Sequence, residues 1–350
     1  MIVLIVATIF TACSKEETSL NNNNPGNPNN PNNPGSGRYI HWTRHGITTD
    51  DQFSRTARLV KDGKIYASPY SYSTDGINWT TDPNDGLNRS FQNLSGDFWV
   101  EISYTSSGTT KTYTALNSGA SITLTNPFHG VVAWNGGSKA YTIANNYQLP
   151  GGAWDDDYIL ETTDGVNWEP ILNQPPHIGN MGSILKIWLI DGNLHALSMN
   201  TTQGTGIIEY KLHISNGNSW ISSGSFPKTI EINKVTGHGI FANMDGGTYK
   251  LVVNGPSITF QNLEFENPAD NSTQISGQTL NANGMLLLAT LGRLYVPHPV
   301  TDKLFNPSPS EGNNALPGVG GIVVFGNELI VTRGWFVYKT PFPFIYHENP

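Results

Sequence analysis

The sequence has one cysteine, Cys13, among its 350 residues, and only 13% of its residues are charged. A single cysteine excludes an internal disulfide framework and a thiolate metal cluster. With 19 Lys and Arg residues against 27 Asp and Glu residues, the net charge is −8, so the basic footprint of a nucleic-acid-binding protein is missing. No apolar run reaches the roughly 18 residues that a membrane-spanning helix needs.

Turn-forming and aromatic residues are abundant instead. The sequence contains 37 Gly, 22 Pro and 9 Trp residues, and aromatic side chains make up 11% of it. Glycine and proline weaken helices, whereas aromatic residues favour strands. The composition therefore predicts an all-β protein and excludes long helices and coiled coils.

The amino-terminal residues resemble a bacterial lipoprotein signal. Residues 1–12 are nearly all apolar, and Cys13 follows the small residues Thr11 and Ala12. An apolar stretch this short is typical of a signal peptide rather than of a membrane span. The resemblance implies cleavage after residue 12 and attachment of lipid to Cys13. An ordinary signal peptide with an incidental cysteine is the alternative.

Residues 13–37 are predicted to form a disordered tether. The sequence SKEE after the cysteine is similar to the short signal that directs some Bacteroidetes lipoproteins to the outer face of the outer membrane. Residues 21–37 consist of nine Asn, four Pro, three Gly and one Ser, a composition with no apolar side chain to bury. We therefore expect a protein anchored by lipid in the outer membrane, facing the cell exterior on a flexible stalk.

A short motif recurs in the remainder of the chain. Ser73–Trp79 (STDGINW) is repeated as Thr162–Trp168 (TTDGVNW) and, in a shorter form, as Ser215–Trp220 (SNGNSW). We expect the Asp or Asn side chain to accept hydrogen bonds from its own turn, and the Trp to pack between neighbouring sheets. The positions that carry the motif are Asp75, Gly76, Trp79, Asp164, Gly165, Trp168, Asn216, Gly217 and Trp220.

Residues 38–350 are predicted to form one β-propeller. Apolar runs separated by Gly turns recur along this region, a pattern typical of β-hairpins. Two hairpins in every ~45 residues describe four-stranded blades, seven in all, with six as the alternative. Ile40–Thr43 (IHWT) matches Ile77–Thr80 (INWT), so we expect the amino-terminal strand to lie beside Phe336–Lys339 and to close the ring.

The repeated motif resembles the Asp-Gly-x-x-Trp repeats of sialidase-like and kelch-like propellers in bacterial surface proteins. It is one residue shorter than the sialidase Asp box, and the Arg-Ile-Pro signature of sialidases is absent. The repeat is structural in those families, so the resemblance implies a fold and not an activity.

Histidine provides the main candidate site. His45, His129 and His238 each begin a His-Gly-aliphatic triplet, and His177 lies in a related loop, whereas His298 is expected after the second strand of a blade and on the same face. Placed before the first strands of blades, they would converge at the mouth of the central channel, where imidazoles bind a divalent metal or transfer protons. The alternative is that each His stabilises its own blade. We predict no resident cofactor and leave open a divalent metal at the His-lined mouth.

A loop expected on the same rim carries further candidates. Trp154 directly precedes Asp155, Asp156 and Asp157. Carboxylate oxygens bind Ca²⁺, but the run lacks the spacing of a calcium loop, and a solvated acidic loop is the alternative. An aromatic ring such as that of Trp154 offers a face on which a sugar stacks.

The sequence thus predicts a monomeric cell-surface lipoprotein that binds no nucleic acid. Its partners are the outer membrane, through the lipid anchor, and a glycan or surface protein that binds to one rim of the propeller without catalysis. The alternative is a carbohydrate-active enzyme, a lyase or a glycoside hydrolase, that uses the His-lined channel mouth.

Overall fold

The computed structural model of this chain describes only part of it. The described residues are 38–49, 54–68, 71–81, 89–95, 98–104, 109–125, 131–145, 157–176, 182–201, 205–226, 230–244, 247–267, 279–289, 293–298, 303–307 and 319–348. They are all-β, as the composition predicts, and contain no helix. None of the described segments is therefore a helix with the length and apolar character of a membrane span. The predicted signal peptide, Cys13 and the tether lie outside the described residues.

The strands form successive groups of four antiparallel neighbours, which we number as sheets I to VII. Sheet I contains β4 (Thr56–Lys61), β5 (Lys64–Ser68), β6 (Ser71–Ser73) and β7 (Asn78–Thr81). Sheet II contains β8 (Arg89–Ser95), β9 (Phe98–Tyr104), β10 (Thr110–Ala115) and β11 (Ser121–Thr125). Sheet III contains β12 (Val132–Ala133), β13 (Ala140–Ala144), β14 (Tyr158–Thr162) and β15 (Glu169–Pro170).

Sheets IV and V are joined to each other through their last strands. Sheet IV contains β16 (Ser183–Ile190), β17 (Asn193–Thr201), β18 (Ile208–Ser215) and β19 (Trp220–Ser223). Sheet V contains β20 (Glu231–Val235), β21 (Gly239–Met244), β22 (Gly247–Asn254) and β23 (Ser257–Asn262). A short parallel pairing of β19 with β23 makes them one eight-stranded sheet.

Of the last two groups, sheet VII includes a strand from the other end of the chain. Sheet VI contains β24 (Thr279–Ala282), β25 (Met285–Ala289), β26 (Leu294–Pro297) and β27 (Leu304–Phe305). Sheet VII contains β28 (Gly321–Phe325), β29 (Glu328–Arg333), β30 (Phe336–Pro341) and the amino-terminal β2 (Thr43–Gly46). Of the remaining strands, β3 (Thr48–Thr49) pairs with β7, and β1 (Arg38–Ile40) pairs with β31 (Tyr346–Glu348).

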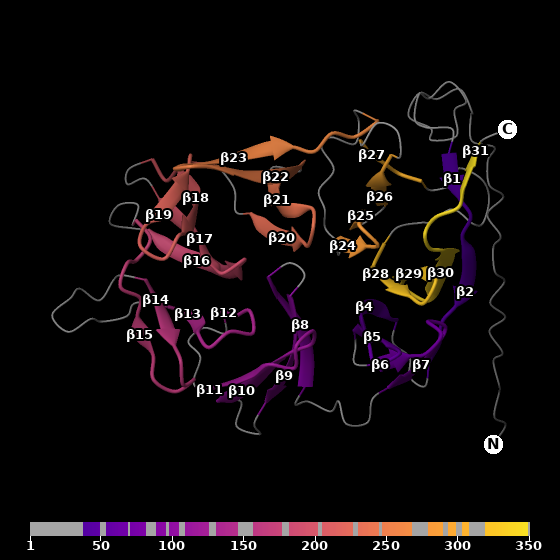
Figure 1. The fold of residues 1–350 in the computed structure, drawn as a ribbon, viewed down its shortest axis with the longest axis horizontal. Coiled ribbons are helices and arrows are strands. Elements are labelled where there is room, and N and C mark those ends of the chain that lie inside the picture. The colour runs from indigo at the N-terminus through magenta and orange to yellow at the C-terminus, as the bar shows by residue number, and fades with distance from the viewer. Residues whose placement is uncertain are drawn as a thin grey trace, which may run out of the picture.

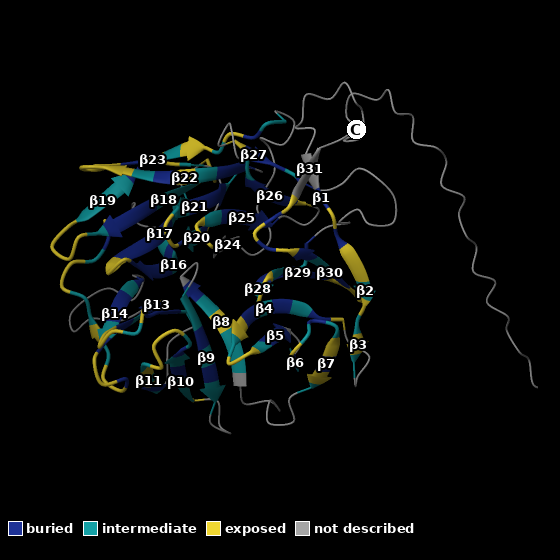
Figure 2. Cartoon of the chain, turned by 45° about the vertical axis from the view of Figure 1, so that its right-hand side comes forward, coloured by how far each residue is buried: buried dark blue, intermediate teal, exposed yellow. Residues whose placement is uncertain are grey.

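The sheets are arranged around a common centre (Figure 1). The first strand of each sheet lies nearest the centre and the last strand lies at the circumference, as β20 and β23 show in sheet V. Figure 2 shows buried residues on the strands between neighbouring sheets and exposed residues mainly on turns and outer strands. This radial packing of four-stranded sheets is the architecture of a β-propeller.

Two-residue turns join several of the hairpins. Asp62 and Gly63 connect β4 to β5, with φ angles of 50° and 69°, and Asn283 and Gly284 connect β24 to β25, with φ angles of 51° and 78°. Two successive positive φ angles define the type I′ turn, whose twist matches that of the flanking strands. The Gly turns that the sequence predicts therefore form the hairpins.

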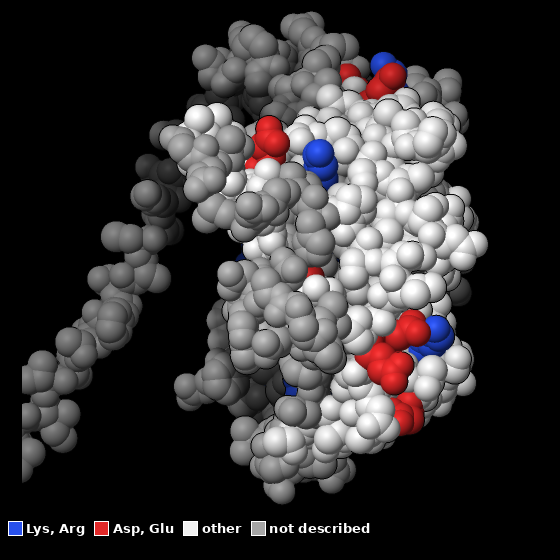
Figure 3. Space-filling model, turned by 90° about the vertical axis from the view of Figure 1, so that its left-hand side faces the viewer, with Lys and Arg blue, Asp and Glu red and all other residues white. Residues whose placement is uncertain are grey.

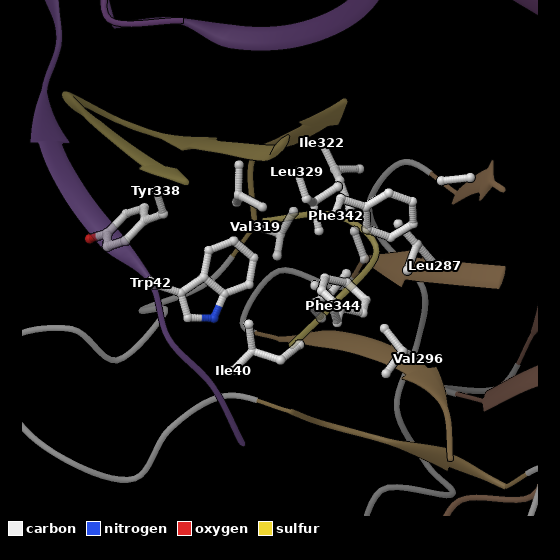
Figure 4. Close-up of a cluster of buried hydrophobic side chains, with 14 of the residues drawn as sticks. Ile40, Trp42, Leu287, Val296, Val319, Ile322, Leu329, Tyr338, Phe342 and Phe344 are labelled. Atoms are coloured by element: carbon white, nitrogen blue, oxygen red, sulfur yellow. The ribbon is translucent and has the colours of Figure 1, made fainter. Parts of the chain in front are cut away.

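The hydrophobic core is divided among the spaces between neighbouring sheets. Trp79 of sheet I packs with Val323 and Ile330 of sheet VII, for example, and Phe241 of sheet V packs with Leu286 of sheet VI. Figure 4 shows the cluster between sheets VI and VII, which also takes in Ile40 and Trp42 from the amino-terminal segment. Each pair of sheets is therefore held together mainly by burial of apolar side chains.

The amino-terminal strand that the sequence predicts beside the last sheet does pair there. β2 runs antiparallel to β30, with Thr43 opposite Lys339 and Gly46 opposite Phe336. The sequence match placed Ile40–Thr43 in this position, and that placement is wrong, because of these four residues only Thr43 lies in the paired strand. Ile40 instead pairs with Tyr346, and both Ile40 and Trp42 are buried between sheets VI and VII. Burial of these two large apolar side chains shifts the paired segment by three residues.

Candidate functional site

The repeated motif forms the turn between the third and fourth strands of its sheet. In sheet I, Oδ1 of Asp75 accepts hydrogen bonds from the backbone N–H groups of Ile77 and Asn78, each at 2.8 Å. The Asn78 side chain donates to the other carboxylate oxygen, and the Ser73 hydroxyl donates to Oδ1. Partial desolvation acts to raise the pKa of Asp75, but these hydrogen bonds outweigh it and lower the pKa to about 2.

The second and third copies have the same geometry. Asp164 accepts hydrogen bonds from the N–H groups of Val166 and Asn167, which lower its pKa. In the third copy Asn216 replaces the acid, and its Oδ1 accepts from the N–H groups of Asn218 and Ser219. Because a neutral amide performs the same task, the motif carboxylates shape turns and do not form a catalytic pair.

The Gly and Trp of the motif contact the preceding sheet. A Cβ atom on Gly165 would lie 1.9 Å from the carbonyl oxygen of Thr123 in β11. The indole of Trp168 donates a hydrogen bond to Thr125 of sheet II, and that of Trp220 donates to Asn173 beside sheet III. In this third copy nothing lies within 4 Å of a Cβ on Gly217. The motif therefore joins neighbouring sheets, as its Trp predicts.

The structure separates the histidines that the sequence grouped together. His45 lies in β2 at the outer edge of sheet VII, and His238 lies in the turn between β20 and β21. Neither precedes the first strand of a sheet, so the placement that the sequence predicted for these two residues is wrong. The His-Gly sequence recurs, but the burial of neighbouring apolar residues sets the strand register independently around each copy. His298 follows β26, the third strand of sheet VI and not the second as the sequence predicted, and its Nδ1 lies 3.5 Å from a carboxylate oxygen of Glu266.

The acidic loop is described only at its last residue. Asp157 is buried, and its Oδ2 accepts a 2.9 Å hydrogen bond from the backbone N–H of Ile184 in sheet IV. The interpretation of a solvated acidic loop is therefore wrong for Asp157, which links sheets III and IV. His129, Trp154, Asp155, Asp156 and His177 lie outside the described residues. Among the residues that are described, no three His, Cys, Asp or Glu side chains come together as a metal site.

A cavity of about 570 Å³ lies between sheets V and VI. Its volume is within the range of roughly 300–1,000 Å³ that is usual for small-molecule sites. Phe241, Leu286 and Leu304, all buried in the cluster between the two sheets, form its apolar part. The polar side chains around it come from both sheets and their connecting segments: His238, Lys250, Gln261, Asn262, Glu264 and Lys303.

The strand register explains how the cavity is built. Lys250 of β22 lies opposite Phe241 of β21 and opposite Gln261 of β23. Residues directly opposite one another in an antiparallel sheet point to the same face, and Phe241 shows that this face packs against sheet VI. Beyond β23 the chain crosses to sheet VI, where Phe265 forms a bridge with Leu304. That crossing segment brings Glu264 to the cavity, where its carboxylate lies 3.4 Å from Nζ of Lys303.

Several polar groups of this cavity are not used by the fold. Within the described part of the chain, the side chains of Lys250, Gln261 and Asn262 have no hydrogen-bond or ion-pair partner, and Nε2 of His238 is buried without one. Sequence reasoning found His238 but missed the other residues. Lys, Gln and Asn on a strand are unremarkable in a sequence, and only the pairing of the strands with the crossing segment brings them together.

Charged groups are sparse on one side of the molecule. Figure 3 shows a side of the molecule on which Lys, Arg, Asp and Glu are few and form small groups, separated by uncharged residues. The described ion pairs, such as Lys139 with Glu161 and Lys339 with Glu328, are at the surface and partly exposed, where a pair contributes about 0–1 kcal/mol.

Comparisons with known proteins give structural likeness only. No protein-family model matches the chain, and no curated protein matches it. The extracellular domain of the putative hybrid two component system BT4673 from B. thetaiotaomicron is similar, with a TM-score of 0.48, 12% identity and coverage of 86% of this chain. This chain spans 40% of that protein chain.

Two further solved structures are similar over most of the chain. YCF48 from Cyanidioschyzon merolae has a TM-score of 0.46 and 14% identity, with 87% of this chain and 99% of that chain covered. The β-propeller domain of the Trilobed protease from Pyrococcus furiosus has a TM-score of 0.42 and 8% identity, with 85% and 96% covered. The conclusion that this chain is a propeller depends on its own sheet arrangement, described above.

Proposed function

We propose that this protein is a lipid-anchored binding protein of the bacterial cell surface, whose propeller binds a glycan without catalysis in the cavity between sheets V and VI. The observation that carries the proposal is the cavity itself, which combines an apolar wall with polar side chains that have no partner in the described structure. Lys250, Gln261 and Asn262 are exposed to solvent, so their donors and acceptors are accessible to a ligand that enters the cavity.

The amino-terminal sequence supports the cellular location. Residues 1–12 have the character of a signal peptide, Cys13 stands where a lipoprotein signal would be cleaved, and residues 21–37 have the composition of a flexible tether. A tether of 17 residues reaches about 50 Å when extended at ~3.1 Å per residue. The binding domain would therefore work away from the lipid surface.

The proposed architecture is a closed ring of seven blades. Sheets I to VII supply the blades, and the pairing of β2 with β30 supports closure by the amino-terminal strand. The parallel pairing of β3 with β7 extends the same amino-terminal segment from sheet VII to sheet I. A ring closed in this way has no exposed sheet edge between first and last blades, which suits a protein that is exposed outside the cell.

The cavity lining suits a sugar. A pyranose has apolar C–H faces and a rim of hydroxyl groups, so it needs an apolar surface beside hydrogen-bonding side chains. The apolar surface is provided by Phe241, Leu286 and Pro297. The hydrogen-bonding side chains are the amides of Gln261 and Asn262, which both donate and accept. The carboxylate of Glu264 adds a strong acceptor for hydroxyl groups.

The test fills the cavity with an indole, the side chain that already packs between sheets VII and I. Leu304→Trp places an indole where sheet I carries Trp79, and it should leave the circular dichroism spectrum unchanged while lowering glycan binding more than tenfold. Binding would be measured with the purified full-length protein on an array of neutral and acidic oligosaccharides, and then by calorimetry for each one bound. Leu172→Trp is the matched control, because Leu172 is 95% exposed and does not line the cavity.

Two outcomes would reject the proposal. One is that the wild-type protein binds no oligosaccharide on the array. The other is that the Leu304→Trp protein, still folded, binds the same oligosaccharides with the affinity of wild type.

A further inference from the structure

Lys250 places an uncompensated positive charge in the cavity between sheets V and VI. Within the described residues, the other cation of the cavity, Lys303, has Glu264 as its partner at 3.4 Å, whereas no carboxylate lies within ion-pair distance of Lys250. Lys250 is exposed beside the cavity, so an anion bound there would meet a cation that no described carboxylate already pairs with.

The position of the Lys250 side chain is set by the backbone beside it. Its Cε atom lies 3.3 Å from the point where a Cβ on Gly239 would stand, so the lysine stem crosses the backbone next to His238. The absence of a side chain at Gly239, whose φ is 116°, leaves room for this path. The ammonium group is therefore carried toward the end of the cavity that His238 lines.

His238 supplies a second group that has no partner at the same end. Its Nε2 is buried and makes no hydrogen bond in the described structure, although the residue lines the cavity. A buried polar nitrogen without a partner destabilises the folded state. A small rotation of the ring toward the cavity would let this nitrogen donate to an oxygen of a bound ligand.

We propose that the saccharide bound in this cavity carries an anionic group, a carboxylate or a sulfate on C6 of a pyranose, held between Lys250 and His238. Gln261 and Asn262 then face the ring hydroxyls, and Glu264, neutralised by Lys303, does not repel the anion. This inference rests on the proposed function, since it specifies which glycan the cavity takes. Neither residue belongs to a recognisable sequence motif for acidic sugars.

The experiment compares two sugars that differ only at C6. Methyl β-glucuronide has a carboxylate where methyl β-glucoside has a hydroxymethyl group, and calorimetry with the full-length protein gives both affinities. The glucuronide should bind at least tenfold more tightly, because a charge-assisted contact is about twice as strong as a neutral one. Glucose 6-sulfate and inorganic sulfate form a second pair, which separates recognition of the sugar from recognition of the anion.

Lys250→Met tests the residue itself. The methionine keeps an unbranched stem over Gly239 and removes the charge, so it should reduce glucuronide binding about tenfold and glucoside binding much less. Lys211→Met is the control, because Lys211 lies on β18 of sheet IV and does not line the cavity. His238→Gln, which restores a donor at a similar reach, should lose less affinity than His238→Ala.

The possible results distinguish the two proposals. If glucoside and glucuronide bind equally and Lys250→Met changes neither, the anion inference is wrong while glycan binding stands. If inorganic sulfate binds as tightly as glucose 6-sulfate, the sugar contributes nothing and the inference is also wrong. If neither sugar pair binds and the array is blank, the proposed function itself fails.

Discussion

Two interfaces between sheets, VII with I and V with VI, differ in the side chain that packs between them. Trp79 in the last strand of sheet I is 3% exposed and packs against Ile330 of sheet VII. Leu304 occupies the corresponding last strand of sheet VI and packs against sheet V, but it also borders the cavity. An indole fills the space beside Ile330 at the first interface, whereas at the second a cavity borders the smaller leucine.

The backbones also approach each other more closely at the filled interface. A Cβ on Gly321 of sheet VII would lie 2.1 Å from the carbonyl oxygen of Ala57 in sheet I, and the Ala57 N–H donates to the Thr332 hydroxyl at 2.8 Å. At the other interface, nothing lies within 4 Å of a Cβ on Gly284, which lines the cavity from sheet VI. The first interface is built for stability, and the second has room for a ligand.

The largest loss of stability is expected from removing the indole between sheets VII and I. Trp79→Ala removes a buried indole and its hydrogen bond to the Gly76 carbonyl, and should lower the free energy of unfolding by about 3–5 kcal/mol. Leu304→Ala enlarges a cavity that already exists and loses fewer contacts, so we expect about 2 kcal/mol. Urea unfolding of both variants would measure the difference.

Equal losses from the two substitutions would break the comparison. They would show that the leucine interface depends on its side chain as strongly as the tryptophan interface does. The cavity would then be tightly coupled to the stability of the ring.

A smaller loss of stability is expected from adding a methyl group at a close contact between sheets II and III. Gly165→Ala combines a φ of 78° with a Cβ that would overlap the Thr123 carbonyl oxygen, so we expect a loss of about 2–4 kcal/mol. Gly255→Ala is the control in sheet V, because its φ of 55° is also positive while nothing lies within 4 Å. That variant should lose only about 1 kcal/mol. Thermal and urea unfolding of the pair would show whether the difference comes from the contact, and similar losses would show that it does not.

The smallest effect concerns the charge in the turn that precedes Trp79. Asp75 has a folded-state pKa of about 2, below the 3.8 expected when it is unpaired, so its ionised form stabilises the fold above pH 4. This contribution, at most about 1 kcal/mol at a partly exposed site, is lost as the pH falls from about 4 to 2. Asp75→Asn should therefore be slightly less stable than wild type at pH 6 and equal to it near pH 2.

The midpoint of thermal unfolding, measured between pH 2 and pH 6, would check this prediction. Asn216→Asp makes the reverse change in sheet IV and should introduce the same pH dependence there. A constant difference between wild type and Asp75→Asn across this range would contradict the prediction.

The sequence was informative where one short segment determines its own structure. Asp75 with the N–H groups of Ile77 and Asn78 forms a turn whose partners are all within three residues, so its repeat reveals strands, turns and the packing Trp. The strand at the amino terminus was also predictable, although its register was wrong by three residues because burial of Ile40 and Trp42 depends on side chains from sheets VI and VII.

The candidate site could not be predicted in the same way. Sequence reasoning grouped His45 with His238 because both begin a His-Gly-aliphatic triplet. The structure nevertheless puts them on sheets VII and V. Lys250 and Gln261 carry no motif, and they become neighbours only through the pairing of β22 with β23. Leu304 joins them from a different sheet by way of the chain that crosses from β23.

By itself the sequence determined the all-β class, the repeated Asp-Gly turn and the strands that each turn joins, because hydrogen bonds within a few residues and the alternation of apolar side chains act locally. Only the tertiary structure decided which interface between sheets is filled and which is hollow. That outcome depends on the volume of side chains from two sheets that are distant in sequence, and volume is settled only when the sheets pack together.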